Sequence, residues 1–427
     1  MIFPKLPVLK KLSQRFLNLL ELPFENITFV CVQHILETTG SLFEALTRHG
    51  AKPENIYIMG KFYSTHAETA ERMRKELGLK YYDSKVPIRL GEFHNYFSKD
   101  INSLWVQVIR KLKQAHNHSI IVIDEGGMCI RRVPDYVLRN FNVIGLEQTT
   151  SGIKNHHQTK FPVIDIASSA IKKHVECLLI IETIIEKLKS HINLKNNSTY
   201  GVIGLGNIGR SLAIYLKNKG LRVNIYDIDP VKECPSGVHK CPNVIDLLNS
   251  SEIIFGCTGD HLPNESWFSE VTGEKILVSC SSADIEFLEI LHRAENPLIE
   301  RKNNHYLIQT AVYKDLDNKL IYRILNGGFP INFDRTSQSV PSMDIQLTRG
   351  LIFAGMIQAA ALLETDIKYL PNTIMLDPIL QRYTIKTWMQ YRKSRLDFHS
   401  DLKVKNLTDT DWIKRESGKG INITHFT

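Results

Sequence analysis

The chain has 427 residues, of which 43% are apolar and 23% charged, and this composition excludes a disordered or fibrous protein and predicts two globular domains. The 53 basic and 45 acidic residues give a net charge of +8 without a long basic run, so nucleic acid is not an expected partner. The chain contains no run of 18 uncharged apolar residues, so a membrane is not an expected partner. Seven scattered cysteines without a CxxC pair predict reduced thiols, a cytoplasmic location and no metal site.

The first third of the chain alternates strand and helix patterns. Residues 1–20 predict an amphipathic surface helix and not a signal peptide. Apolar runs at 26–33, 55–59 and 119–124 predict buried strands, and amphipathic stretches at 37–49 and 64–77 predict helices. Ser64 or Thr65 is the expected N-cap of the second helix. Strand–helix–strand at this spacing indicates a parallel sheet with right-handed crossovers.

A second alternating unit follows a long helix predicted at 168–187 and a polar linker predicted at 194–198. Strands are expected at 200–205, 222–226, 253–256 and 276–279, with a helix at 208–219. A mostly apolar helix at 343–363 is expected to pack back against the first domain.

The strongest motif is Gly204-Leu205-Gly206-Asn207-Ile208-Gly209, between the predicted strand and helix, with Asp227 eighteen residues beyond its last glycine. In this pattern the first glycine allows a tight turn, the second lets a pyrophosphate approach the backbone, and the third lets the helix pack on the sheet. The phosphates would rest on the helix N-terminus. Asp227 would accept from the ribose hydroxyls and favour NAD over NADP, although Arg210 and Lys232 are nearby cations.

The chain resembles the S-adenosylhomocysteine hydrolase (adenosylhomocysteinase) family over roughly residues 25–370. The resemblance rests on ordered segments that include Ile123-Asp124-Glu125-Gly126-Gly127, the run 145–152 (GLEQTTSG), the glycine motif itself, Cys257-Thr258-Gly259 and Ile331-Asn332. It implies an α/β fold in which a Rossmann-type NAD-binding domain is inserted in a split α/β substrate domain. The implied parts are the first substrate segment at 1–195, the NAD domain at 196–340, a return segment at 341–400 and a tail at 401–427.

The resemblance also implies the chemistry of the family, in which bound NAD⁺ oxidises a ribose hydroxyl and so acidifies a neighbouring C–H bond. Lys172 aligns with the family's lysine beside that hydroxyl, and Asn332 aligns with the residue that contacts the nicotinamide carboxamide. A partly buried lysine near a cationic nicotinamide is a plausible proton acceptor. The cofactor-binding residues expected are Thr149, Thr150, Ser151, Gly204, Gly206, Asn207, Ile208, Gly209, Asp227, Thr258, Gly259 and Asn332.

The substrate half departs from the family pattern. Family histidines are replaced by Gln33, Ser282 and Val340, a strand-end Asp by Glu125, and a ribose-binding Glu by Gln148. Glutamine cannot shuttle a proton at neutral pH, so authentic adenosylhomocysteine chemistry is disfavoured. The catalytic candidates are Lys172, Glu125, Glu176 and His34, and the substrate-binding candidates are Gln33, Glu37 and Gln148.

Three of the catalytic candidates have a structural alternative: Lys172 as a helix-surface lysine, Glu125 as a cap of the turn at Gly126-Gly127, and His34 as a packed strand-end histidine. The function expected is NAD-dependent oxidation of a secondary alcohol on a nucleoside- or sugar-like small molecule, either as a dehydrogenase or as a transient step in elimination or epimerisation. The alternatives are an authentic S-adenosylhomocysteine hydrolase and a non-catalytic NAD-binding regulator. The family is typically tetrameric, but its C-terminal tail motif is absent, so a homodimer or a homotetramer is expected.

Overall fold

The structure is a computed structural model that describes residues 2–17, 23–113, 119–154, 159–192, 198–281, 283–295, 299–302, 305–366, 370, 372–393, 407–418, 421 and 426. The chain forms two compact units. Unit 1 comprises Met1–Ser84, Ser98–Leu179 and Arg335–Thr427, and unit 2 comprises Lys85–Phe97 and Ile180–Asp334. The protein is therefore α/β, with one open sheet in each unit.

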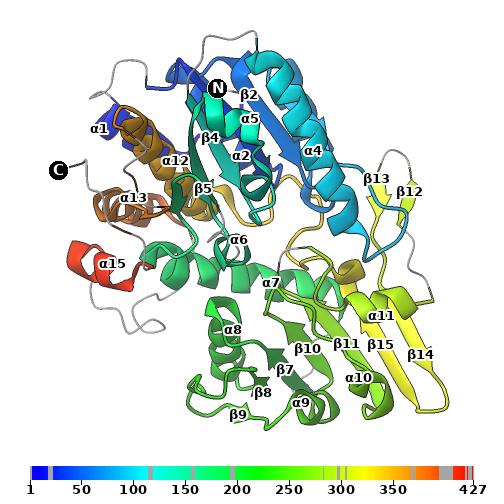
Figure 1. The fold of residues 1–427 in the computed structure, drawn as a ribbon. Coiled ribbons are helices and arrows are strands. Elements are labelled where there is room, and N and C mark those ends of the chain that lie inside the picture. The colour runs from blue at the N-terminus through cyan, green and yellow to red at the C-terminus, as the bar shows by residue number, and fades with distance from the viewer. Residues whose placement is uncertain are drawn as a thin grey trace. The chain divides into compact units, whose positions relative to one another are not determined.

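Unit 1 is built on a seven-stranded parallel sheet in the order β16-β6-β5-β4-β1-β2-β3. Figure 1 labels its strands β2, β4 and β5. The strands predicted at 26–33, 55–59 and 119–124 are β1, β2 and β4. The strand order reverses between β1 and β4, which makes the carboxyl ends of these two strands the usual place for a ligand. The bounds are β1 Ile27–Gln33, β2 Ile56–Gly60, β3 Lys80–Asp83, β4 Ser119–Asp124, β5 Asn142–Glu147, β6 Val163–Asp165 and β16 Thr373–Met375.

The core helix of unit 1 is α12, Ser342–Leu363, which packs against α1, α2 and α13 and against β4 and β5. Its length and apolar composition would suit a membrane span, but 94% of its most apolar window is buried, as is usual for a core helix. The prediction that this segment packs back on the first domain is confirmed. The other helices are α1 Pro7–Phe16, α2 Glu37–Arg48, α3 Ala67–Lys75, α5 Asp135–Asn140, α6 Thr150–Lys154, α13 Pro378–Tyr391 and α15 Thr410–Glu416.

Two local expectations in unit 1 need correction. The N-cap of α3 is His66 and not Ser64 or Thr65, because the His66 ring accepts from the backbone N–H of Thr69 while residues 62–64 form a 3₁₀ turn. The helix expected at 168–187 begins with a π-helical turn, Lys172–Glu176, and continues as α7, Cys177–His191. Further 3₁₀ turns lie at Pro53–Asn55 and Ile130–Arg132.

Unit 2 holds the second sheet, in the order β14-β15-β11-β10-β7-β8-β9, with β14 antiparallel to β15 (Figure 1). This order, counted from β7, is that of the dinucleotide-binding Rossmann fold with one added edge strand. The bounds are β7 Thr199–Ile203, β8 Arg222–Tyr226, β9 His239–Lys240, β10 Ile253–Gly256, β11 Gly273–Ser279, β14 Ala311–Asp315 and β15 Leu320–Ile324, with a separate hairpin of β12 Glu300–Lys302 and β13 His305–Leu307.

The helices of unit 2 are α8 Asn207–Asn218, α9 Val244–Ser250, α10 Ser266–Ser269 and α11 Leu288–Arg293, with a 3₁₀ turn at Leu325–Gly328. The chain passes between the units within α4, Phe93–Leu112, and within α7. The longer segment of unit 2 runs from Ile180 to Asp334, whereas the resemblance implied an NAD domain at 196–340. This segment includes α7 from Ile180 onward, and within it Lys187 forms an ion pair with Asp334. The predicted linker at 194–198 lies, except for Ser198, outside the described residues.

Residues 85–97 also belong to unit 2, which the sequence did not indicate. Gly91 donates its backbone N–H to the Asp284 carboxylate at 2.7 Å, and the Phe93 ring packs edge-on to Phe329 with centroids 5.8 Å apart. These contacts join a segment from the first third of the chain to residues nearly two hundred positions later.

Candidate functional site

The turn from β7 into α8 carries the three motif glycines, and the structure around each of them is different. Gly204 has a φ of +96°, a backbone angle that residues other than glycine rarely adopt. A Cβ added at Gly209 would lie 1.8 Å from the Gly204 carbonyl oxygen, so α8 begins directly against the turn. A Cβ added at Gly206 would meet nothing within 4 Å. The backbone at Gly206 is therefore open on the side from which a phosphate would approach.

The first turn of α8 faces this open space. Gly206 is the N-cap of the 12-residue helix, and Asn207 and Ile208 are its first two residues. No backbone acceptor among the described residues takes the N–H groups of Asn207 and Ile208. Free donors at the positive end of a helix dipole form a favourable place for an anion.

Asp227 follows β8 and is anchored by three hydrogen bonds. Its carboxylate accepts from the Leu205 backbone N–H at 2.5 Å, from Asp229 N–H at 2.9 Å and from Lys232 Nζ at 2.9 Å. Burial would raise the pKa of Asp227, but Lys232 and the backbone donors outweigh this effect and hold it below its ordinary value. The carboxylate is therefore charged at neutral pH and fixes the glycine turn.

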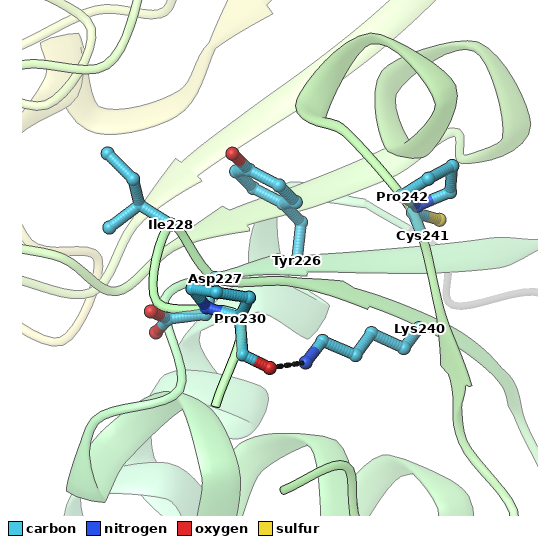
Figure 2. A pocket seen from close by; sticks show the side chains of 7 residues that line it. All are labelled: Tyr226, Asp227, Ile228, Pro230, Lys240, Cys241 and Pro242. Carbon is cyan, nitrogen blue, oxygen red and sulfur yellow. Dashed lines mark hydrogen bonds between the residues drawn. The ribbon is translucent and has the colours of Figure 1, made fainter. Parts of the chain in front are cut away.

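A cavity of about 400 Å³ opens beside Asp227 (Figure 2). Tyr226 and Ile228 line it from the end of β8, and Cys241 and Pro242 line it from beyond β9. At its edge, Lys240 Nζ donates to the Pro230 carbonyl at 2.8 Å (Figure 2). The lining combines apolar side chains with two charged groups, the Asp227 carboxylate and the Lys240 ammonium.

The loop after β10 is organised by a buried carboxylate that the sequence candidates did not include. Glu286 accepts from the backbone N–H groups of Thr258 at 2.8 Å and Gly259 at 3.2 Å, and from Ser279 Oγ at 2.8 Å. Burial raises the pKa of Glu286, although these donors act in the opposite direction. Thr258 and Gly259 thus lie at the carboxyl edge of the unit 2 sheet, with their N–H groups bound to Glu286.

Asn332 lies at the same carboxyl edge of the unit 2 sheet. The preceding residue, Ile331, donates its N–H to the Ser279 carbonyl at the end of β11 at 3.1 Å. The Asn332 side chain is buried, and no partner for its amide is found within the described part of the chain. A buried amide with free hydrogen-bonding groups suits a polar ligand.

In unit 1, His34, Glu125 and Lys61 meet where the strand order reverses. Glu125, just after β4, accepts from Lys61 Nζ and lies 3.2 Å from His34 Nε2. His34 Nδ1 lies 2.6 Å from Ser64 Oγ. Because the carboxylate can only accept, His34 donates through Nε2 and its Nδ1 accepts from the Ser64 hydroxyl. The structure thus brings together two catalytic candidates and adds Lys61 and Ser64.

The charges of this cluster balance within it. Burial would raise the pKa of Glu125, but Lys61 and His34 hold it well below its ordinary value. Burial would lower the pKa of Lys61, but Glu125 raises it above the ordinary range. Burial lowers the pKa of His34, and Glu125 only partly offsets this. At neutral pH the cluster is an ion pair beside a neutral imidazole, so Glu125 does more than cap the glycine turn.

The loop after β5 is held by Glu147 and packs on the Gly126-Gly127 turn. The Glu147 carboxylate accepts from Thr149 N–H at 2.7 Å, Thr149 Oγ1 at 2.6 Å and Gly126 N–H at 3.2 Å. A Cβ on Gly152 would lie 2.2 Å from the Glu147 carboxyl carbon, so α6 needs a glycine there. Burial, with Asp124 as a secondary cause, raises the pKa of Glu147 well above its ordinary value.

The three hydroxyl residues predicted to contact the cofactor, Thr149, Thr150 and Ser151, have different surroundings. The Thr149 hydroxyl is bound to Glu147 and also accepts from the Gly152 N–H at 3.1 Å, so it caps α6. Thr150 is exposed and Ser151 half-buried on the same short helix. Thr150 and Ser151 are thus better placed than Thr149 to reach a ligand.

The glutamines that replace family residues have free acceptors. Gln33 is fully buried at the end of β1, and Gln148 is buried just after β5. The side-chain oxygen of each has no hydrogen-bond partner within the described ranges. By contrast, Glu37 accepts from Gln338 Nε2 at 3.0 Å. Gln33 and Gln148 are therefore equipped to accept from a ligand hydroxyl or N–H at the carboxyl edge of the sheet.

Lys172 and Glu176 form a close pair across the π-helical turn. Lys172 Nζ lies 2.7 Å and 2.6 Å from the two Glu176 oxygens, with the lysine 19% and the glutamate 8% exposed. Lys172 is therefore not a free surface lysine. Arg349 of α12 is also buried, and Glu176 is the acidic group that acts on it electrostatically.

The sequence candidates omitted Lys61, Ser64, Glu286 and Arg349. Lys61 directly follows β2, and the carboxyl ends of parallel neighbours share one edge of a sheet, so strand prediction already contained a signal for it. Arg349 gave only a weak signal, as a charge within an apolar helix. Ser282 lies outside the described residues. No group of three or more potential metal ligands occurs among the residues that the structure describes.

No family model matches the chain. Among solved structures, NAD⁺-bound 3-phosphoglycerate dehydrogenase from Entamoeba histolytica gives a TM-score of 0.38 at 11% identity, covering 79% of this chain and 94% of that one. The NAD complex of a D-isomer specific 2-hydroxyacid dehydrogenase from Lactobacillus delbrueckii ssp. bulgaricus gives 0.29 at 13% identity, covering 61% and 72%. The fold assignment itself rests on the strand order.

Two curated relatives align over most of the chain. An uncharacterized protein in two strains of Mycobacterium tuberculosis is 27% identical over 344 residues, which are 79% of this chain and 64% of that protein, so the chain spans just under two thirds of its length. The S-inosyl-L-homocysteine hydrolase of Methanopyrus kandleri is 30% identical over 370 residues, covering 80% of each chain. The chain belongs to the family of this S-inosyl-L-homocysteine hydrolase.

Proposed function

We propose that the protein is an NAD-dependent enzyme that oxidises a secondary alcohol of a nucleoside- or sugar-like small molecule. The observation that carries the proposal is the β7–α8 turn, where an open backbone at Gly206 and free helix donors lie beside the anchored carboxylate of Asp227. When bound, NAD⁺ supplies a hydride acceptor to such a site.

The residues of unit 2 fit NAD along its length. Asn207 and Ile208 would hold the pyrophosphate through their N–H groups, and Asp227 retains acceptor capacity for a ribose hydroxyl. The cavity lined by Tyr226, Ile228 and Pro242 has room for an adenine ring. The unpartnered amide of Asn332 would bind the nicotinamide carboxamide.

Unit 1 supplies the groups that would bind the substrate and move its protons. The free oxygens of Gln33 and Gln148 would accept from substrate hydroxyls. Lys172 would pass one proton to the bound carboxylate of Glu176 and would then take the alcohol proton. Neutral His34, held in one tautomer by Glu125 and Ser64, would serve a second proton transfer.

The named relative favours a second candidate, hydrolysis of a purine nucleoside thioether through transient oxidation. The 30% identity with the S-inosyl-L-homocysteine hydrolase covers four fifths of the chain. In this candidate the same alcohol oxidation occurs, but NAD⁺ is regenerated within each turnover. A net dehydrogenase accumulates NADH, whereas the hydrolase releases a nucleoside and a thiol.

The first experiment extracts the nucleotide from purified full-length protein and measures NAD⁺ and NADH. The protein is then mixed with inosine, adenosine, S-inosylhomocysteine and S-adenosylhomocysteine, while absorbance at 340 nm and thiol release are followed. We expect bound NAD and a change at 340 nm with at least one compound. Protein that retains neither NAD⁺ nor NADH would refute the proposal.

Lys172→Met and its neighbour Lys173→Met form a matched pair of variants. We expect Lys172→Met to retain NAD but to reduce it at least about 100-fold more slowly, as is typical for loss of a general base. Lys173→Met should reduce NAD at the normal rate. If both variants behave alike, Lys172 is not the base. If NAD is bound and nothing reduces it, a non-catalytic NAD-binding regulator replaces the enzyme.

A further inference from the structure

Arg349 is a buried cation that forms no ion pair with an acidic group of the described chain. It is 5% exposed, and it and Asp344 are the charged residues of the apolar helix α12. Asp344 is at the start of that helix and accepts from the Lys393 backbone N–H at 2.9 Å. Burying a guanidinium is costly unless an acceptor compensates for the lost hydration.

The contacts of Arg349 leave most of its donors unused. Nε donates to Thr38 Oγ1 at 3.2 Å, and within the described ranges no carboxylate forms an ion pair with the guanidinium. Burial lowers the pKa of Arg349 to about 10, and Glu176 offsets this only in part. Both oxygens of Glu176 are already bound to Lys172. An arginine has five N–H donors, and only one of those of Arg349 has a partner among the described residues.

Arg349 also contacts the first turn of a long helix. Thr38 is the second residue of α2, which has 12 residues. In that turn, Glu37 N–H donates to the Ser337 carbonyl and Thr39 N–H to the Leu36 carbonyl, but no acceptor among the described residues takes the Thr38 N–H. The buried fork of Arg349 and the positive end of α2 therefore meet at Thr38.

The surroundings are not acidic enough to neutralise this arrangement. Glu37, next to Thr38, is bound to Gln338 and lies 3.8 Å from Arg72. Glu125 is matched by Lys61. Glu37 and Glu125 thus have their own cation or amide partners, and no carboxylate of the described chain forms an ion pair with Arg349.

We infer that Arg349 and Thr38 bind an anionic group, a carboxylate or a phosphate, carried by the small molecule that unit 1 accepts. A planar fork beside a helix N-terminus is suited to two parallel hydrogen bonds with such a group. This inference rests on the proposed function only in so far as unit 1 is the substrate unit. It requires the substrate to carry an anionic group, which a plain nucleoside or sugar does not have.

The test measures binding to full-length protein loaded with NADH, so that oxidation cannot occur. S-inosylhomocysteine is compared with its decarboxylated analogue, and inosine 5′-monophosphate is compared with inosine, by titration calorimetry. In one of the two pairs, we expect the member that carries the anionic group to bind about 10- to 100-fold more tightly than the member that lacks it, the range of a charge-assisted hydrogen-bonded pair. The pair that shows the preference identifies the source as a carboxylate or a phosphate.

Arg349→Met should abolish this preference, while the partner that lacks the anionic group binds as before. Arg349→Lys should restore part of it, and Thr38→Val should weaken it without removing the cation. Arg48→Met, which changes a half-exposed arginine paired with Glu44 on the same helix, should leave it intact. If Arg349→Met does not fold, the Lys and Val variants carry the test.

Equal affinity within both pairs in the unmodified protein would overturn the inference, as would a preference that persists in Arg349→Met. Failure of the proposed function has a different signature, because it appears as the absence of bound NAD or of any absorbance change at 340 nm. Anion binding at Arg349 can be measured in either case.

Discussion

Asp284 shows how a single buried carboxyl makes the stability of unit 2 depend on pH. It accepts from Gly91 N–H, and burial raises its pKa from 3.8 to about 6. The folded state therefore holds the proton more tightly than the unfolded state. The stabilisation from that proton is complete below pH 3.8 and is lost as the pH rises through about 6.

Asp284→Asn removes the charge and keeps an oxygen that can accept from Gly91. We expect the variant to gain up to about 3 kcal/mol of unfolding free energy over the unmodified protein at pH 7, and little at pH 3.5. Urea denaturation at a series of pH values measures this difference. A gain that does not change with pH would mean that the carboxyl is not protonated near pH 6.

The Lys61–Glu125 pair gives a second residue-scale prediction. Lys61→Met leaves the Glu125 carboxylate buried without its cation, which typically costs about 3–5 kcal/mol. The same change should raise the pKa of His34, because Lys61 is one of the groups that lower it. Denaturation and NMR titration of His34 measure the two effects.

The double variant Lys61→Met with Glu125→Leu removes both charges. It should recover much of the lost stability, because an apolar pair replaces an ion pair of similar volume. If the double variant loses as much unfolding free energy as the two single variants together, the residues are not coupled.

The sequence identified Glu125 and His34 but not Lys61, although all three meet in the structure. Glu125 and His34 adjoin recognisable strand ends, whereas the significance of Lys61 depends on the pairing of β1 with β2. Arg349 was missed for a related reason. A charge in an apolar helix becomes informative only when the tertiary structure shows that no described acid compensates for it.

The β7–α8 turn is the element for which the sequence was most informative. Its glycines are spaced by the local geometry of one strand, one turn and one helix, so the spacing alone predicts their roles. Glu286 shows the opposite case. It organises the loop of Thr258 and Gly259 from 28 and 27 residues away, a role that depends on the tertiary structure.

Gly206→Ala and Gly209→Ala separate cofactor binding from folding at this element. The Cβ at Gly206 meets no atom, so the fold should lose less than about 1 kcal/mol, but the methyl group would stand where the pyrophosphate must approach. We expect NAD to bind at least about tenfold more weakly, as measured by calorimetry.

Gly209→Ala should destabilise unit 2 by about 1–3 kcal/mol, because the added carbon overlaps the Gly204 carbonyl. The stability difference between the two variants is measured by thermal unfolding. If Gly206→Ala binds NAD as well as the unmodified protein, the phosphates do not approach Gly206.

Several short strands were not predicted, for a physical reason. β6 and β16 have three residues each and β3 has four, which is too short for a hydrophobic period to be visible. Their positions are fixed by pairing with neighbours distant in sequence, as β16 pairs with β6. The buried strands β1, β4 and β7, by contrast, were recognisable from their continuous apolar runs.

At the scale of the whole molecule, the division into two units predicts separate responses to NAD. A ligand that binds one unit raises the unfolding free energy of that unit by about 2.7 kcal/mol at 100 times its dissociation constant. We expect NAD to shift the calorimetric transition of unit 2. Hydrogen exchange should show the added protection chiefly in β7, β8 and the start of α8.

The boundaries of these units were the part of the architecture least accessible to sequence reasoning. The inserted order was implied by the family resemblance, but the assignment of residues 85–97 to unit 2 depends on side-chain and backbone contacts with Asp284 and Phe329. Composition does not change at residue 85, so nothing local indicates that the chain leaves unit 1 there.

The place of α12 in unit 1 has a consequence for the order in which a newly made chain can fold. When residue 334 leaves the ribosome, every strand of unit 2 has been synthesised, whereas unit 1 still lacks the helix that covers β4 and β5 and the strand β16 that completes its sheet. Roughly the first third of the chain must therefore wait, with apolar surface uncovered, while a later segment folds ahead of it. We expect nascent chains arrested at that point to engage chaperones through the amino-terminal segment, and to lose this association once α12 has emerged.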